Sequence, residues 1–286
     1  MGSLLSQVST AFSNAYSGWI LWNLFLAFIP LLLSFWLFRP KAIPKPGLWI
    51  SLVVMAMIGV VGFWPRIPRT VRSLSSTLAD AANGSGVAQL RLLGIVGVIG
   101  MLLIISVLVI KNPQLPKGWL WWVGLFAFIA FLPNAPYVLT DIVHLIRGIS
   151  SGRMPAWVIA LAFVPVHLTA ILLGFEAYVI SILNLGHYLK QIGARTLILP
   201  AELAIHALSA IGIYLGRFLR FNSWDVVIEP TSVLVDTLNV LTSRRPAAVI
   251  VVTFLVLTVL YWLMKQVTLG LKLRIEYARK GIDAFS

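Results

Sequence analysis

A double proline interruption breaks an apolar segment of the chain between Phe131 and Leu145. Pro133 and Pro136 lack an amide hydrogen, and each disfavours helix in the residue that precedes it. We therefore expect an opened backbone around Asn134, whose side-chain amide can satisfy a freed carbonyl locally. A helix can restart after this point, with Pro136 in its first turn.

Three polar side chains of different chemistry lie along the helix that is expected to restart. Tyr137, Asp141 and His144 are spaced i, i+4 and i+7, so they share one helical face. A phenol, a carboxylate and an imidazole on one face can hold a cation, relay a proton or bind a lipid headgroup. The alternative is that the span simply reaches water here, with the carboxylate solvated near a helix start.

A second polar segment runs from Gly212 to Asp225, at the end of another apolar run. Gly212 and Gly216 form a GxxxG pair, and small residues at this spacing let a second helix approach closely. Arg217 and Arg220 follow one turn apart. They either hold an anion or anchor the helix end at the lipid headgroups.

The order of the spans predicts that these two segments meet at one membrane face. Asp141 lies just past the fourth expected span, and Arg217 and Arg220 lie just past the sixth. Trp22 and Asn23, near the start of the first span, fall on the same side. We therefore expect an ion pair between Asp141 and either Arg217 or Arg220. The candidate binding residues are Asn134, Tyr137, Asp141, His144, Arg217, Arg220, Asn222 and Asp225, and the candidate catalytic residues among them are Asp141 and His144.

A second polar set lies deeper in the apolar sequence and comprises His167, Glu176, Glu202 and His206. Glu202 and His206 are spaced i, i+4, and the order of the spans places Glu176 in the same half of the membrane. This set can form a metal site, a proton or ion path, or a structural pair in which a neutral carboxyl bonds an imidazole. We favour the structural pair and expect no metal.

Runs of about twenty apolar residues, each long enough to cross a hydrocarbon core of about 30 Å, recur along the chain. Since 59% of the residues are hydrophobic and 11% are charged, the sequence predicts an all-α, polytopic transmembrane helix bundle of about seven spans. The expected spans are Trp19–Phe38, Leu48–Trp64, Leu90–Ile110, Trp119 to the break at Pro133, Pro155–Leu183, Leu199–Phe218 and Ala247–Met264.

One transmembrane domain accounts for most of the chain. We expect a short tail over 1–18, a helical domain over 19–265 with interfacial segments at 65–90 and 219–246, and a basic tail over 266–286. Val71, Leu74 and Leu78 make one face of a short helix in the first interfacial segment. The first tail has no charged side chain and the last is basic, which predicts the N-terminus outside and the C-terminus inside.

Several function classes are disfavoured by composition and motifs. The formal net charge of +13 is spread over nearly every loop, as for residues that flank spans, so we expect no nucleic-acid partner. The chain has no cysteine, which excludes disulfides and thiolate chemistry. It has no P-loop, Rossmann fingerprint, HExxH or GxSxG motif, and we expect no cofactor.

Three segments in order resemble the DUF1361 family of bacterial integral membrane proteins. They are Trp22–Pro30, Phe131–Leu145 with the string LPNAPYVLTDIVHL, and Gly212–Asp225 with the string YLGRFLRFNSWD. The interval between the first two is long, and the second and third spans look like an addition. The resemblance implies a membrane fold and a site at the shared face, and it implies no activity.

We expect a non-catalytic membrane protein with a polar pocket at its outer face, either transporter-like or an accessory or assembly component of a membrane complex. The alternative is an intramembrane enzyme for a lipid or lipid-linked anionic substrate, with Asp141 and His144 as acid and base. The lack of an obvious nucleophile favours the first. The expected partners are the lipid bilayer, anionic lipid headgroups and a membrane-protein complex. The expected location is the bacterial inner (plasma) membrane, with a thylakoid-type membrane as the alternative.

Overall fold

The computed structural model describes residues 19–90, 92–93, 96, 118–152, 155–221 and 230–281. Every regular element within these ranges is helical, which confirms the predicted all-α class. The elements are α2 (Trp19–Phe38), α3 (Lys45–Phe63), η1 (Trp64–Arg66), α4 (Ile67–Ala82), α6 (Trp119–Phe131), α7 (Asn134–Tyr137), η2 (Val138–Asp141), α8 (Ile142–Ser150), α9 (Ala156–Val158), η3 (Ile159–Phe163), α10 (Val164–Gln191), η4 (Arg195–Leu197), α11 (Ile198–Tyr214), η5 (Leu215–Leu219), α13 (Pro230–Thr242) and α14 (Arg244–Arg279).

Six runs of helix within the described residues are long and apolar enough to cross a membrane, so the chain is an integral membrane protein. They are Trp19–Phe38, Pro46–Arg66, Trp119–Ser150, Ala156–Gln191, Arg195–Leu219 and Arg244–Arg279. These runs match six of the seven expected spans. The remaining span, expected from Leu90 to Ile110, lies almost wholly outside the described residues. The total of seven and the orientation remain predictions.

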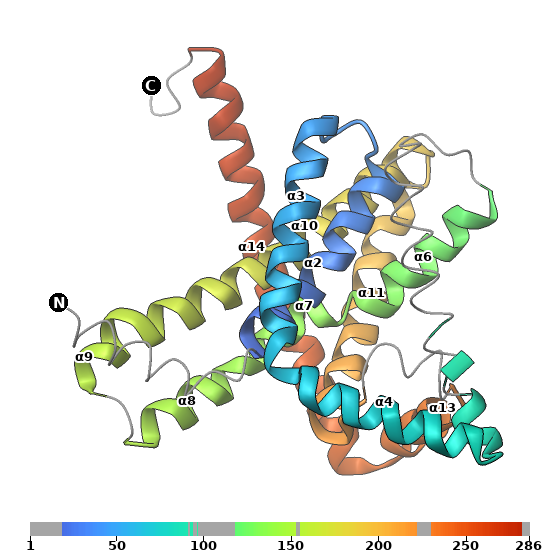
Figure 1. Ribbon diagram of the computed structural model, residues 1–286. Helices are drawn as coiled ribbons and strands as arrows, with labels where there is room; N and C mark the ends of the chain where they lie inside the picture. Colours follow the sequence, from blue (N-terminus) through green and yellow to red (C-terminus); the bar gives the residue numbers. More distant parts are fainter. Residues whose placement is uncertain are drawn as a thin grey trace.

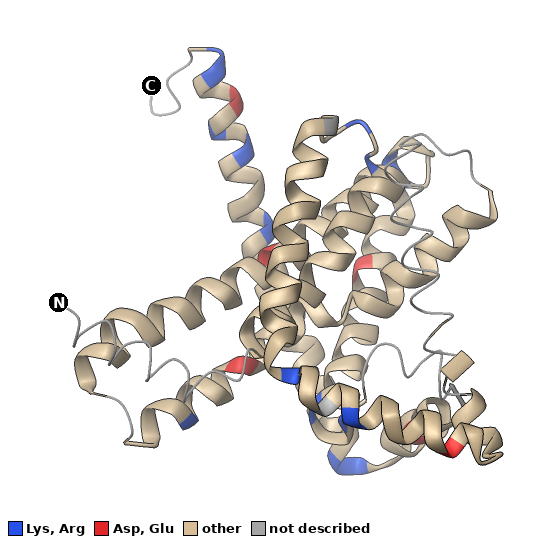
Figure 2. Cartoon of the chain, in the orientation of Figure 1, with Lys and Arg blue, Asp and Glu red and all other residues tan. Residues whose placement is uncertain are grey.

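Two shorter helices lie in the segments expected at the membrane surface. The helix predicted around Val71 is confirmed as α4, and its apolar residues Val71, Leu74 and Leu78 are exposed. α13 occupies part of the second segment. In Figure 1 both helices lie at the lower end of the bundle, whereas the α2–α3 connection and the C-terminal end of α14 lie at the upper end. Figure 2 shows that Lys and Arg gather at both ends, with few charged residues between them.

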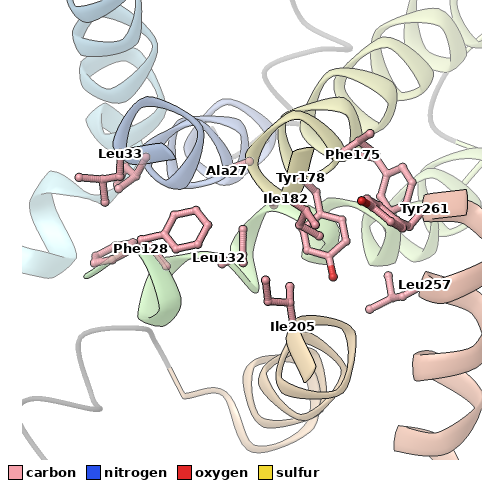
Figure 3. Close-up of a cluster of buried hydrophobic side chains, with 14 of the residues drawn as sticks. Ala27, Leu33, Phe128, Leu132, Phe175, Tyr178, Ile182, Ile205, Leu257 and Tyr261 are labelled. Atoms are coloured by element: carbon pink, nitrogen blue, oxygen red, sulfur yellow. The ribbon is translucent and has the colours of Figure 1, made fainter. Parts of the chain in front are cut away.

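The core lies where α2, α6, α10, α11 and α14 meet. α10 packs along α2, and α11 packs along α14. Figure 3 shows side chains from all five helices converging there: Ala27, Leu33, Phe128, Leu132, Phe175, Tyr178, Ile182, Ile205, Leu257 and Tyr261. Tyr178 has the largest fully buried side chain among the residues that the structure describes. This core fixes the relative positions of the helix ends that form the candidate site.

α14 is longer than a bilayer core requires. Its 36 residues, at a rise of 1.5 Å each, extend about 54 Å. The helix continues without a break past Lys265, so the segment expected to be a basic tail starts inside it. Every described residue after Thr268 is exposed, and Figure 1 shows this end of the helix standing clear of the others.

Irregular turns interrupt the spans near the lower end. π-helical turns occur at η3 and at η5. Arg220, directly after η5, has φ 62° and is the only non-glycine residue with positive φ among the described residues. A left-handed conformation costs a non-glycine residue about 1–2 kcal/mol. Such strained positions and π-turns concentrate at functional sites, and both occur at this end of α11.

Candidate functional site

The proline break is closed locally by the side chain expected to do so. α6 ends at Phe131, and α7 begins at Asn134. Asn134 Nδ2 donates a hydrogen bond to the Phe131 carbonyl oxygen at 2.9 Å, which confirms the expected local partner. Ala135 and Pro136 are buried. The break is therefore packed inside the bundle.

The two glycines of α11 and η5 let this helix approach the break closely. A Cβ atom added at Gly212 would lie 2.7 Å from Pro133 Cβ, well inside van der Waals contact. One added at Gly216 would lie 3.2 Å from Tyr137 Cε2. The GxxxG pair thus serves as the contact surface for the interrupted span, as the spacing predicted.

Asp141 is buried and bound by an amide from a distant segment. It is 1% exposed, so the reading in which this carboxylate is solvated is wrong. Asn23 Nδ2, from 118 residues earlier in the chain, donates to Asp141 Oδ2 at 2.9 Å and to Oδ1 at 3.2 Å. The start of α2 is thereby fixed against the end of η2.

Arg217 bonds to the same segment but not to the expected partner. Its Nη1 donates to His144 Nε2 at 3.3 Å, and its Nη2 donates to the Thr140 carbonyl oxygen. Its Cζ lies 5.6 Å from the centre of the Tyr137 ring. The expected ion pair of Asp141 with Arg217 or Arg220 is not formed, and the carboxylate accepts from the amide of Asn23.

Aromatic rings enclose the two histidines at this end of the bundle. The Trp19 ring centre lies 4.3 Å from that of His144 and 5.5 Å from that of His167. His167 is fully buried, and its Nδ1 donates to the Phe163 carbonyl oxygen at 2.8 Å. His167 therefore belongs with His144 at the lower end and is separate from the deeper set in which the sequence placed it.

Asp141, His144, His167 and Arg217 together form a polar cluster at this end of the bundle. A cavity of about 640 Å³ lies beside this polar cluster. α2, the end of α3 with the start of α4, the break between α6 and α7, the end of α11 with η5, and α13 surround it. Among the described residues, the polar ones that line it are Asn23, Arg66, Thr70, Asn134, Tyr137 and Arg220, and the others are apolar, aromatic or glycine. A volume of this size is typical of small-molecule sites in proteins.

The cavity contains some of the predicted site residues and leaves out others. Asn134, Tyr137 and Arg220 line it, whereas Asp141 and His144 do not. Arg217 also lies behind the wall. Two residues connect the cluster to the cavity: Asn23, which binds Asp141, and Tyr137, which lies under Arg217. Asn222 and Asp225 lie outside the described residues.

Sequence reasoning missed three contributors to this site. Arg66 lines the cavity, and its Cζ lies 5.7 Å from the Trp22 ring centre. Trp19 contacts both histidines, and Val233 brings α13 to the cavity. The order of the spans already assigned Arg66 and Trp19 to this face, so a full list of polar and aromatic residues at that face would have found them.

Two residues of the deeper polar set, Glu202 and His206, are satisfied by partners on other helices. Glu202 Oε1 accepts from Tyr261 Oη at 2.7 Å and from Lys265 Nζ at 2.6 Å. His206 Nδ1 lies 2.7 Å from Tyr178 Oη. The expected Glu202–His206 bond is therefore replaced by contacts to α14 and α10.

Glu176 stands apart from these contacts. Its Oε1 accepts from Thr268 Oγ1 at 2.7 Å, while its Oε2 is buried and has no hydrogen-bond partner within the described part of the chain. Among the residues that the structure describes, no three His, Cys, Asp or Glu side chains are placed to hold a metal ion.

These observations define the class of protein. It is an integral membrane helix bundle that has a cavity lined by polar and apolar side chains at one end and buried polar contacts in its core. A family model described as "Protein of unknown function (DUF1361)" matches residues 95–259. The match covers more than half of the 286 residues, so the chain belongs to this family, as the motifs indicated. It includes the proline break and Gly212–Asp225, and it begins after Trp22–Pro30. No curated protein and no solved structure matches the chain.

Proposed function

We propose that this protein is a non-catalytic membrane component that holds a small amphipathic molecule in the cavity at its outer face. It acts either as a transporter-like component or as an accessory or assembly factor for a membrane complex. The observation that carries the proposal is the cavity of about 640 Å³, whose lining combines amides, a phenol and guanidinium groups with an apolar wall. The proposed location is the bacterial inner (plasma) membrane.

The candidate acid and base support binding over catalysis. His144 Nε2 accepts a hydrogen bond from Arg217, so the lone pair that would take a substrate proton is occupied. The Asp141 carboxylate is held by Asn23 and is buried. Neither side chain lines the cavity. We infer that both residues hold the wall of the cavity and take no part in a reaction.

The test fills the cavity with a large side chain and identifies which bound molecule is lost as a result. Ala130 lines the cavity from α6, and Ala130→Phe should displace a bound molecule. The matched control is Ala204→Phe on α11, because Ala204 is exposed and lies outside the lining. After gentle detergent extraction, mass spectrometry of bound lipids, metabolites and proteins should show a species retained by the original chain and by the control and depleted from the cavity variant.

A second variant guards against misfolding at Ala130. Thr70 is exposed and lines the cavity from α4, so Thr70→Phe narrows it from outside the core. Depletion by both cavity variants supports the proposal. Equal retention by all three folded variants would show that the cavity binds nothing that the protein carries, and the proposal would fail.

A further inference from the structure

The described residues that line the cavity carry positive charge only. Arg66 and Arg220 contribute two guanidinium groups, and none of the described lining residues is acidic. An anion bound beside the Arg220 guanidinium gains Coulomb energy in a low-dielectric surrounding. The charge of the described lining therefore favours an anionic group as the occupant of the polar part of the cavity.

Arg220 has the features of a ligand-binding side chain. It is exposed, it lines the cavity, and its side chain makes no hydrogen bond or ion pair with any described residue. Its backbone is left-handed, and the N–H groups of Arg220 and Phe221 both donate to the Leu215 carbonyl oxygen across the π-turn. A strained backbone that holds an unpaired cation at a cavity is typical of a binding site.

Arg66 and the neutral donors complete a polar cradle. Arg66 Nη1 donates to the Gly62 carbonyl oxygen at 2.7 Å, which fixes the guanidinium at the wall. A guanidinium has five N–H donors, so a wall contact and a ligand contact are compatible. Tyr137 adds a hydroxyl donor to the lining. Asn23 and Asn134 also line the cavity, but their Nδ2 atoms donate to Asp141 and to the Phe131 carbonyl oxygen. Guanidinium groups beside a hydroxyl suit the oxygens of a phosphate, which arginine binds in a bidentate manner.

The apolar part of the lining continues onto the outside of the bundle. Phe126, Ile129 and Leu208 line the cavity and are 49%, 44% and 50% exposed. In a membrane these side chains face hydrocarbon, and they belong to spans on both sides of the cavity. The cavity therefore opens toward lipid on this side. A lipid whose phosphate lies in the cavity can leave its tail against this wall, where the tail replaces surrounding hydrocarbon and no apolar surface meets water.

We propose that the cavity binds the phosphate of a phospholipid or lipid-linked phosphate between Arg220 and Arg66, with its tail against Phe126, Ile129 and Leu208. This inference rests on the proposed function and names the ligand class of the same cavity. The amphipathic helix α4, whose exposed apolar residues suit the interface, places the polar part of the cavity at headgroup depth.

The experiment measures lipid binding to the delipidated full chain in detergent by native mass spectrometry. Phosphatidylglycerol is the probe. Dioleoylglycerol supplies tails without a phosphate, and glycerol phosphate and inorganic phosphate supply the free anion. The chain should bind phosphatidylglycerol at least about tenfold more tightly than dioleoylglycerol, since a charge-assisted contact contributes about that factor or more. It should also bind phosphatidylglycerol at least about tenfold more tightly than the free phosphates, which have no tail to hold the anion in the apolar phase beside the cavity.

The variants assign that binding to Arg220. Arg220→Gln removes the charge and should weaken phosphatidylglycerol binding about tenfold or more, whereas Arg220→Lys should retain part of it. The matched control is Arg72→Gln on α4, because Arg72 is an exposed arginine outside the lining. Equal effects of Arg220→Gln and Arg72→Gln would overturn the proposal.

The arms also separate this inference from the proposed function. Suppose that dioleoylglycerol binds as tightly as phosphatidylglycerol and that Ala130→Phe abolishes the binding of both. Recognition of a phosphate is then refuted, while binding of a molecule in the cavity still stands. Free phosphates that bind as tightly as the lipid overturn the lipid source. Binding that is unaffected by Ala130→Phe while the variant remains folded refutes both.

Discussion

At the residue scale, the buried pair of Asn23 and Asp141 has the largest structural role in the candidate site. It joins two segments 118 residues apart, and the carboxylate is 1% exposed. A buried carboxylate is stable only while it is hydrogen-bonded, because burial removes its water. Asn23 supplies both of the hydrogen bonds that its oxygens accept within the described residues.

Removal of the amide alone should therefore destabilise the bundle. We expect Asn23→Leu to lower the free energy of unfolding by about 1.5–3 kcal/mol, the range for a hydrogen bond to a charged group that leaves the charge buried. The measurement is equilibrium unfolding in mixed micelles. The double variant Asn23→Leu with Asp141→Leu should lose less free energy of unfolding than Asn23→Leu alone, since it leaves no buried carboxylate without a hydrogen bond. If the two single losses simply add, the pair is not coupled.

The sequence indicated which residues meet at this face but not how they pair. The order of the spans placed Asn23, Asp141 and Arg217 on one side, and the structure brings them together. Opposite charge suggested a partnership between Asp141 and an arginine. The actual choice depends on how each helix is rotated about its axis, which is set by packing contacts that no local pattern encodes.

At the element scale, close contact between α11 and the proline break determines the shape of the cavity. Gly212 and Pro133 both line the cavity and contact each other at its edge. Any side chain at Gly212 must push these two elements apart. The glycine is therefore needed for its lack of a Cβ atom and not for its backbone freedom.

A matched pair of glycine substitutions tests this contact. Gly212→Ala places a Cβ 2.7 Å from Pro133 Cβ and should cost about 1–3 kcal/mol through overpacking. Gly270→Ala in α14 meets nothing within 4 Å and should be neutral or stabilising by up to about 1 kcal/mol through helix propensity. Unfolding in the same micelles compares the two. A similar change for both variants would mean that α11 does not approach the break as described.

Helix boundaries were predicted less well than helix positions, for a physical reason. Hydropathy identifies the part of a helix that can lie in lipid, and it gave an end at Met264 for the last span. α14 continues to Arg279, since the Lys, Arg and Glu residues after Met264 lower the hydropathy of the segment but favour helix. The break at Pro133 was predictable because proline constrains the backbone directly.

At the scale of the whole molecule, the order of the spans predicts on which side of the membrane the cavity lies. All five segments that line it fall, by the order of the seven expected spans, at the face predicted to lie outside. α4 and α13 lie at this end, and the basic end of α14 lies at the other (Figure 1). The asymmetry of basic residues between the two tails supports the same orientation.

The absence of cysteine from the sequence makes this orientation directly measurable. Single cysteines at the exposed positions Asn83 and Ser150 should react with a membrane-impermeant maleimide on intact cells. Cysteines at the exposed positions Lys41 and Lys280 should react only after the membrane is permeabilised. The reverse pattern would place the cavity at the inner face, so that its ligand would come from the inner leaflet. Labelling of Asn83→Cys and Ser150→Cys from opposite sides would contradict the span order itself, because that order puts both positions with the cavity.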